Sequence, residues 1–210
     1  MNRAYIGLAL AGFLAGIVFG DRQMKRWQIE TRLYRVILVL SCAVVFGLGG
    51  WLMSAYGYHI LKAVRYWILM YGLILIGLID SRKKIIPNKA VLVLLGVRTL
   101  LLAGEMACFP QLILEIAVSS GAGLAGGGLL FLTVSLIAKK GIGMGDIKLI
   151  GVMGYYLGFK VLMSNLIVTL TLTVLGGITG LVLRKTSLRS EMPFAPFAAA
   201  GTIITIMMGF

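Results

Sequence analysis

Two aspartates are the residues of this sequence best placed to do chemistry, because each lies at the edge of a long apolar run. Asp80 closes one run and Asp146 opens another. An ionisable side chain at membrane depth is costly to keep and indicates function by default. Two carboxylates brought together share a proton, so that one acts as a base and the other as an acid. The pair predicts peptide-bond hydrolysis at a membrane, with no metal and no cofactor.

Each aspartate also has an ordinary structural explanation. Asp80 could end a helix beside the basic residues 82–84, and Asp146 could cap the start of the next helix. The neighbouring residues favour more than this. Gly143 and Gly145 leave room for a second backbone, so an extended segment there could pair with a substrate by strand addition.

Helix dipoles suggest different roles for the two acids. Asp80 is predicted to end a helix, where negative charge is disfavoured, and Asp146 to begin one, with Lys148 nearby. We therefore hypothesise that Asp80 holds the shared proton at rest, although the basic cluster 82–84 acts in the opposite direction. Pro87 is well placed for the first turn of the helix that follows Asp80.

The composition requires a membrane. Of the 210 residues, 60% are hydrophobic, and the mean hydropathy is +0.99. Twenty Lys and Arg face seven acids, a net charge of +13. Because the basic residues lie between apolar runs, they indicate anionic lipid headgroups rather than nucleic acid as the partner. We predict an all-α integral membrane protein, a polytopic helical bundle forming one domain over residues 1–210.

Eight apolar runs stand out: 4–20, 36–56, 62–80, 88–104, 112–138, 146–160, 161–183 and 194–210. The loops 21–35, 81–89, 139–148 and 184–193 carry fifteen of the twenty Lys and Arg. Under the positive-inside rule this alternation predicts eight spans, an N-terminus outside and both aspartates at the cytoplasmic face. The stretch 149–159 has only eleven residues, too few to cross, so a count of six or seven stays open.

Other polar residues receive structural explanations. Arg98 is expected to extend its side chain to the outer interface, and Glu115 to lie at that interface. Gly123 and Gly127 form a GxxxG pattern that predicts close helix packing. The only cysteines and histidine are Cys42, Cys108 and His59, fewer than the four ligands of a structural zinc.

The motifs around the two acids resemble those of the type IV prepilin peptidase family, GxGD-type aspartic peptidases that include the preflagellin peptidases. Residues 80–88 place Asp80 six residues before Ile-Pro-Asn, with Pro87 and Asn88 matching, and residues 143–149 read Gly-Met-Gly-Asp-Ile-Lys-Leu. Residues 154–158 and 193–197 also resemble family segments. The resemblance covers roughly residues 66 to 200.

This resemblance implies a multi-pass plasma-membrane endopeptidase that removes short, basic leader peptides from prepilin-like substrates at the cytoplasmic face. By position, Asp80 and Asp146 carry over as catalytic, while Gly143, Gly145, Lys148, Pro87 and Asn88 shape the site or bind substrate.

The chain departs from the family pattern in two places. The loop 21–35 lacks the paired CxxC motifs of the bifunctional members, which favours a peptidase-only form without the zinc and methyltransferase insertion. Lys140 stands where many members have an acid, and Glu191 is a candidate for contact with a basic leader.

Two rival functions come from other classes: a small transporter that uses intramembrane acids, and a non-catalytic scaffold for a pilus or secretion machine. A third reading keeps the enzyme but makes transmembrane helices its substrate, as in presenilin-like peptidases; Ile79, where that group has Tyr, argues against it. The sequence does not identify the particular substrate, the cleavage preference or the oligomeric state.

Overall fold

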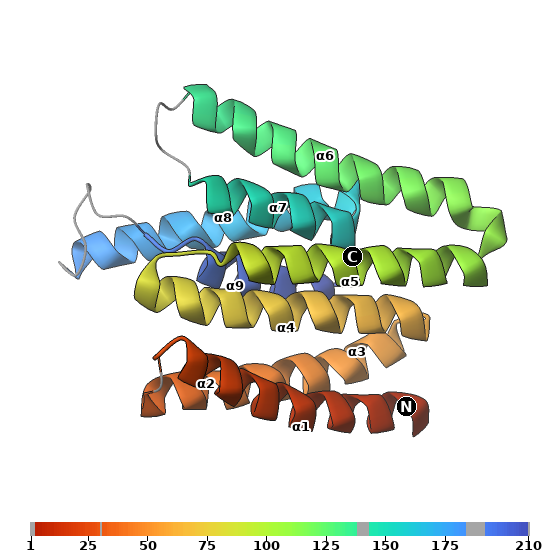
Figure 1. Cartoon of the computed structure of the whole chain (residues 1–210), viewed down its shortest axis with the longest axis horizontal. Coiled ribbons are helices and arrows are strands. Elements are labelled where there is room, and N and C mark those ends of the chain that lie inside the picture. The colour runs from red at the N-terminus through yellow and green to blue at the C-terminus, as the bar shows by residue number, and fades with distance from the viewer. Residues whose placement is uncertain (1–2, 30, 138–142, 184–191, 210) are drawn as a thin grey trace.

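The computed structural model describes residues 3–29, 31–137, 143–183 and 192–209, and these form helices joined by short connections (Figure 1). In chain order they are α1 (Arg3–Arg26), α2 (Arg32–Cys42), the π-helix η1 (Ala43–Leu48), α3 (Gly49–Ala55), α4 (Ile60–Lys83), α5 (Asn88–Cys108), the 3-10 helix η2 (Pro110–Leu112), α6 (Ile113–Ile137), α7 (Met144–Leu157), α8 (Phe159–Val182) and α9 (Ala195–Met207). The predicted all-α fold is confirmed.

Six helical segments of the described chain are long and apolar enough to cross a membrane: Tyr5–Arg26, Arg32–Ala55, Ile60–Lys83, Asn88–Cys108, Pro110–Ile137 and Phe159–Val182. Each of the eight predicted runs does form a helix. However, α7 and α9 have only 14 and 13 residues, about 20 Å of helix, where a span needs about 20 residues. Length therefore supports six spans, the lower end of the predicted range.

The boundary predicted at residue 160 is wrong by a few residues, and a glycine explains the difference. Helix α7 ends at Leu157, and Gly158 then adopts φ +78°. Residues other than glycine rarely adopt this backbone conformation. Helix α8 begins directly afterwards at Phe159, so Lys160 lies in its first turn. The tight reversal at Gly158 keeps α7 short.

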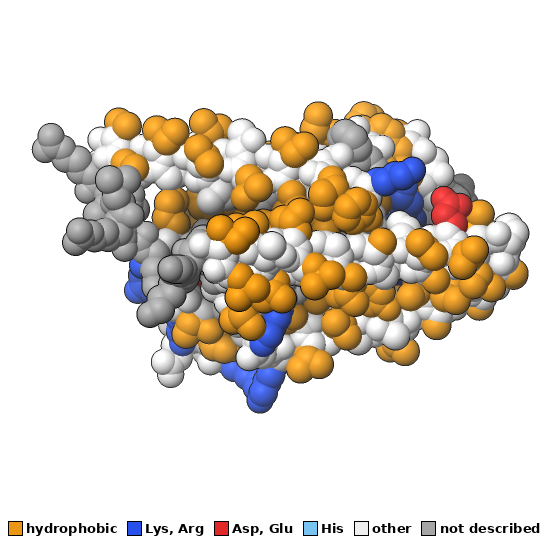
Figure 2. Space-filling model, turned by 90° about the horizontal axis from the view of Figure 1, so that it is seen from above, with side chains coloured by type: hydrophobic (Ala, Val, Ile, Leu, Met, Phe, Trp, Pro, Cys, Tyr) orange, Lys and Arg blue, Asp and Glu red, His pale blue; other side chains and the backbone are white. Residues whose placement is uncertain are grey.

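Most helices lie side by side along one direction, with α4 in the middle of the bundle (Figure 1). In α4, 67% of the apolar window is buried, against 22% in α5, α6 and α8. It contacts α1, α2, α5, α7 and α9. Hydrophobic side chains cover much of the face seen in Figure 2, which suits contact with lipid. Helix α4 is therefore the buried element around which the bundle is arranged, and it carries Asp80.

The ends of α1, α4, α6 and α8 lie together at one end of the bundle, with the starts of α2, α5, α7 and α9 (Figure 1). We call this the basic end, because its helix termini carry Arg22, Lys25, Arg26, Arg32, Arg35, Arg82, Lys83, Lys84, Lys89 and Lys148. Both aspartates lie on helices that end or begin there. The prediction that this end faces the cytoplasm rests on the charge pattern alone.

Helices α6 and α7 pack backbone against backbone. A side chain added at Gly123 would collide with the carbonyl of Gly154, and one added at Gly154 would collide with the carbonyl of Gly123. A side chain added at Gly127, one turn further on, would lie 2.8 Å from the Leu162 side chain of α8 and 3.1 Å from the carbonyl oxygen of Ile150 in α7. The close packing predicted from Gly123 and Gly127 is confirmed, and its partner is the helix that begins with the second aspartate motif.

The prediction that Arg98 reaches the interface is wrong. Its side chain is fully buried and donates to Glu105 Oε2 at 2.9 Å, to Ser120 Oγ at 2.9 Å and to the carbonyl of Tyr155 at 3.0 Å. Arg65 of α4 donates to the same carboxylate at 3.1 Å. Because Glu105 lies two turns beyond Arg98 on the same face of α5, these groups bond each other instead of lipid headgroups.

We expect Glu105→Gln to destabilise the bundle by about 3–5 kcal/mol, because it leaves the buried Arg98 guanidinium without its counter-charge. Glu115 is exposed on α6, so Glu115→Gln serves as the matched control and should change stability by less than about 0.5 kcal/mol. Thermal unfolding of both variants in detergent checks this. Equal midpoints for the two variants would show that the buried network contributes nothing.

Candidate active site

Asp80 lies in the last turn of α4 and is only 5% exposed. A buried carboxylate needs hydrogen-bond donors to compensate for lost water. Its Oδ2 accepts a hydrogen bond from the backbone N–H of Ala195 at 3.0 Å. Ala195 is the first residue of α9, so the carboxylate lies at a helix N-terminus, where the helix dipole stabilises negative charge.

The start of α9 has no cap of its own. Phe194 stands at the N-cap position and makes no side-chain hydrogen bond, and Pro196 has no N–H to offer. The first N–H groups of a helix lack partners within the helix. Asp80 supplies an acceptor from another helix, and this places the Pro-Phe-Ala-Pro segment of residues 193–196 beside the first aspartate.

A glycine lets α9 come this close to α4. A side chain added at Gly77, one turn before Asp80, would lie 3.1 Å from the Cα and 3.2 Å from the nitrogen of Pro196. These atoms belong to the backbone and cannot rotate away. Gly77 was not predicted as a site residue. Its spacing could have identified it, because it lies three residues before Asp80 on the same face of the helix.

Asp146 lies in the first turn of α7, is half-buried, and accepts a hydrogen bond from the backbone of Gly143. The pKa of Asp146 is raised to about 6: burial and the negative charge of Asp80 both raise it, burial more strongly, and the Gly143 hydrogen bond opposes them. The charge of Asp80 thus disfavours the ionised form of Asp146, and the action of the two acids as a working pair stays a prediction.

The two acidic motifs contact each other through their flanking residues. Lys148 Nζ donates to Asn88 Oδ1 at 3.1 Å, which joins the start of α7 to the start of α5. A side chain added at Gly145 would lie 3.0 Å from Cβ of Ile86, in the connection that follows Asp80. Pro87 is buried directly before α5 begins at Asn88. The predicted residues thus lie together at the basic end.

Gly143 is exposed and extended at the N-cap of α7, with φ −70° and ψ 142°. An extended, open residue is compatible with pairing to a substrate backbone, and strand addition stays a prediction. Lys140, Gly141 and Glu191 lie outside the described residues. In the described part of the chain no group of three or more His, Cys, Asp or Glu is placed to hold a metal ion.

We expect Gly77→Ala to loosen the start of α9, because the added methyl group must push the Pro196 backbone away from Asp80. The cost should be about 1–3 kcal/mol, with faster hydrogen exchange at the Ala195 amide. Gly96→Ala on α5 is the matched control, since nothing lies within 4 Å of that position. Unchanged exchange at Ala195 in Gly77→Ala would contradict the close approach.

Comparison with known proteins bears on this site. The sequence pattern of the type IV leader peptidase family matches residues 67–184, which include both aspartates. The chain is 30% identical over 137 residues to a prepilin leader peptidase/N-methyltransferase of Bacillus subtilis, covering 65% of this chain and 52% of that protein. A protein of the same name in Pseudomonas aeruginosa is 26% identical, covering 68% of this chain and 48% of that protein. Another in Pseudomonas putida is also 26% identical, covering 99% of this chain and 68% of that protein.

The chain spans about half the length of the first two relatives. No solved structure matches it. The family match covers more than half of the chain and contains Asp80, Gly143, Gly145, Asp146 and Lys148. With an acid on each of two helices at one end of the bundle and this pattern around them, the chain belongs to the type IV leader peptidase family.

Proposed function

We propose that this chain is an aspartic endopeptidase that removes short, basic leader peptides from prepilin-like proteins, with Asp80 and Asp146 as its catalytic pair. One observation carries the proposal: the residues beside the two acids are in contact, Lys148 with Asn88 at 3.1 Å and Gly145 with Ile86. The raised pKa of Asp146, to which the charge of Asp80 contributes, is consistent with this. Family membership supports the peptidase reaction and the class of substrate.

In the proposed reaction the ionised aspartate takes a proton from water while the water oxygen attacks the scissile carbonyl carbon. The protonated aspartate donates its proton to the carbonyl oxygen. The resulting tetrahedral diol collapses: one of its hydroxyl groups returns a proton to the aspartate that acted as the acid, the C–N bond breaks, and the leaving amine receives the proton that the base had taken. Both carboxyl groups change protonation in each cycle, so they must titrate as a pair.

The surroundings of the two acids favour Asp146 as the proton donor, the reverse of the assignment suggested by helix dipoles. Asp80 lies at the end of α4, as predicted, but it also lies at the start of α9. The start of α9 adds an N–H from Ala195, which stabilises an ionised Asp80. Asp146, whose pKa is raised to about 6, keeps its proton up to a higher pH than an ordinary carboxyl group does. We therefore propose Asp80 as the base and Asp146 as the acid.

The proposed setting is a plasma membrane with the active site at its cytoplasmic face. The shared basic end supports this orientation, since Lys and Arg are retained on the cytoplasmic side. A substrate with a basic leader would approach from that side and place its cleavage site beside the exposed Gly143. We propose the peptidase-only form, because only residues 27–31 connect α1 to α2 and neither cysteine lies there.

We expect Asp80→Ala and Asp146→Ala each to reduce cleavage of a co-expressed pilin-like protein by at least about 100-fold, the contribution typical of a general acid or base. Asp21→Ala is the matched control: this acid lies near the basic end of α1 and pairs with Lys25 and Arg35. Mass spectrometry of the substrate measures the fraction cleaved. Full cleavage by either active-site variant would show that the replaced aspartate is not catalytic.

We expect kcat/KM to fall as pH rises through about 6, the pKa of Asp146, because the proton that Asp146 must donate is lost above it. The sign follows from the raised pKa, since the carboxyl group is protonated below that value and ionised above it. A pH–rate profile with purified enzyme measures this limb. A kcat/KM that increases with pH over the same range would mean that Asp146 acts in its ionised form.

A further inference from the structure

A groove of about 310 Å³ lies between α1, α4 and α5, away from the carboxyl groups of the two acids. Its floor is apolar and includes Ile68, Leu75 and Ile79 of α4. From Ile68 to Ile79 the floor runs eleven residues along the helix, about 16 Å at 1.5 Å per residue. This matches one leaflet, half of a hydrocarbon core about 30 Å thick.

The mouth of the groove lies at the basic end. Arg26 at the end of α1 and Lys89 at the start of α5 line it, together with Trp27. The ammonium of Lys83 lies 5.4 Å from the centre of the Trp27 ring, which adds a third cation beside the mouth. None of the described residues that line the groove is acidic. The groove therefore combines an apolar trough of one-leaflet length with a cationic mouth.

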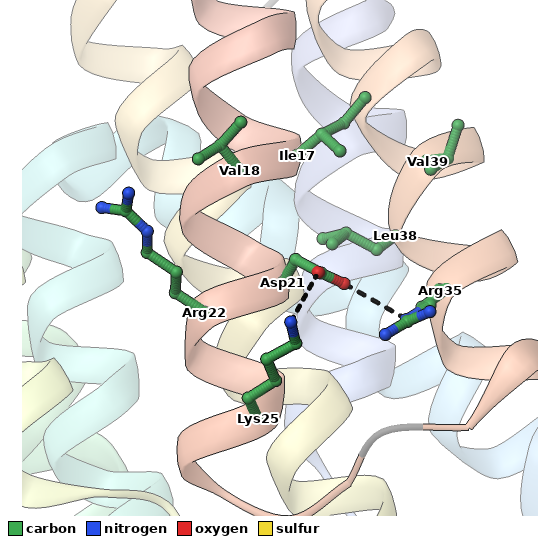
Figure 3. A pocket seen from close by; sticks show the side chains of 8 residues that line it. All are labelled: Ile17, Val18, Asp21, Arg22, Lys25, Arg35, Leu38 and Val39. Carbon is green, nitrogen blue, oxygen red and sulfur yellow. Dashed lines mark ion pairs between the residues drawn. The ribbon is translucent and has the colours of Figure 1, made fainter.

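A second groove at the same end differs in charge. It is lined by Asp21 as well as by basic residues, and Asp21 forms ion pairs with Lys25 at 3.8 Å and Arg35 at 3.3 Å (Figure 3). Asp21, with its two ion pairs, therefore offsets part of the positive charge of the basic residues that line the second groove. Arg22 also lines this second groove and points away from Asp21 (Figure 3). Of these two grooves in the described part of the chain, the one between α1, α4 and α5 pairs an acid-free mouth with a long apolar floor.

From this pairing we infer that the groove between α1, α4 and α5 binds an anionic phospholipid of the leaflet at the basic end. One acyl chain lies along α4, and the phosphate group lies between Arg26 and Lys89. Charge complementarity selects an anionic headgroup, while the trough accepts any acyl chain of suitable length. The bound lipid fills the space between α1 and the α4–α5 pair, next to Ile79 and Pro87, which neighbour Asp80 and Asn88.

Native mass spectrometry of the full chain in detergent tests this, with phosphatidylglycerol and phosphatidylcholine of identical acyl chains as probes. Wild-type protein should retain phosphatidylglycerol in preference to phosphatidylcholine. Arg26→Gln with Lys89→Gln should weaken phosphatidylglycerol binding about 30-fold, since each Lys or Arg at an anionic surface contributes about fivefold. Both side chains are exposed, so the double variant should fold normally.

The matched control removes the same charge from the same end without touching the groove. Arg22→Gln with Arg82→Gln changes two exposed cations that do not line it, and should keep the wild-type preference. Equal losses in the two double variants would overturn the proposal in favour of general surface attraction. Equal retention of both lipids by the wild-type protein would also overturn it.

A third variant tests the trough itself. Val93 lines the groove and is 63% exposed, so Val93→Trp should fill the trough without disturbing the core. It should weaken retention of phosphatidylglycerol and phosphatidylcholine alike. Unchanged lipid binding combined with impaired substrate cleavage would overturn the proposal and assign the groove to an apolar segment of the protein substrate.

Discussion

The hydrogen bond from the Ala195 N–H to Asp80 joins the two parts of the fold on which the proposed chemistry depends. A carboxylate that is 5% exposed at the end of a buried helix needs a donor, and a helix start without its own cap needs an acceptor. Each satisfies the other. Gly77 permits the approach, and buried hydrogen bonds from Asn165 of α8 to Thr202 and Thr205 hold α9 in place. The short helix α9 thus positions an acid that it does not carry.

Helix α7 holds the second acid by a similar arrangement. It is too short to span, yet it is held on two sides. Gly123 and Gly154 bring its backbone against α6, and the Tyr156 hydroxyl donates to the carbonyl of Leu94 in α5 at 2.8 Å. Lys148 adds its hydrogen bond to Asn88. Helix α7 is therefore held with Asp146 at the end of the bundle where α4 ends with Asp80.

Hydropathy and charge predicted the helical elements well, because apolar length and loop charge respond directly to the bilayer. The two acidic motifs were also visible, since a carboxylate beside an apolar run is rare enough to stand out. The number of spans was harder to predict. Helix α7 has only 14 residues because the chain reverses at Gly158, and this reversal decides that α7 is shorter than a span. Arg98 was misjudged because its partner Glu105 lies two turns away in what reads as an outer loop. The role of Ala195 could not be predicted, since a backbone N–H leaves no mark on residue type.

The central claim is that Asp80 and Asp146 form one titrating pair. NMR titration of the chain labelled with carboxyl-13C aspartate, in wild type and in Asp80→Asn, tests it directly. In the wild type the Asp146 carboxyl should titrate near pH 6, and removal of the Asp80 charge should lower that midpoint. An Asp146 titration that is the same in both proteins would mean that the two carboxyl groups do not meet, and the proposed proteolysis would lose its chemical basis.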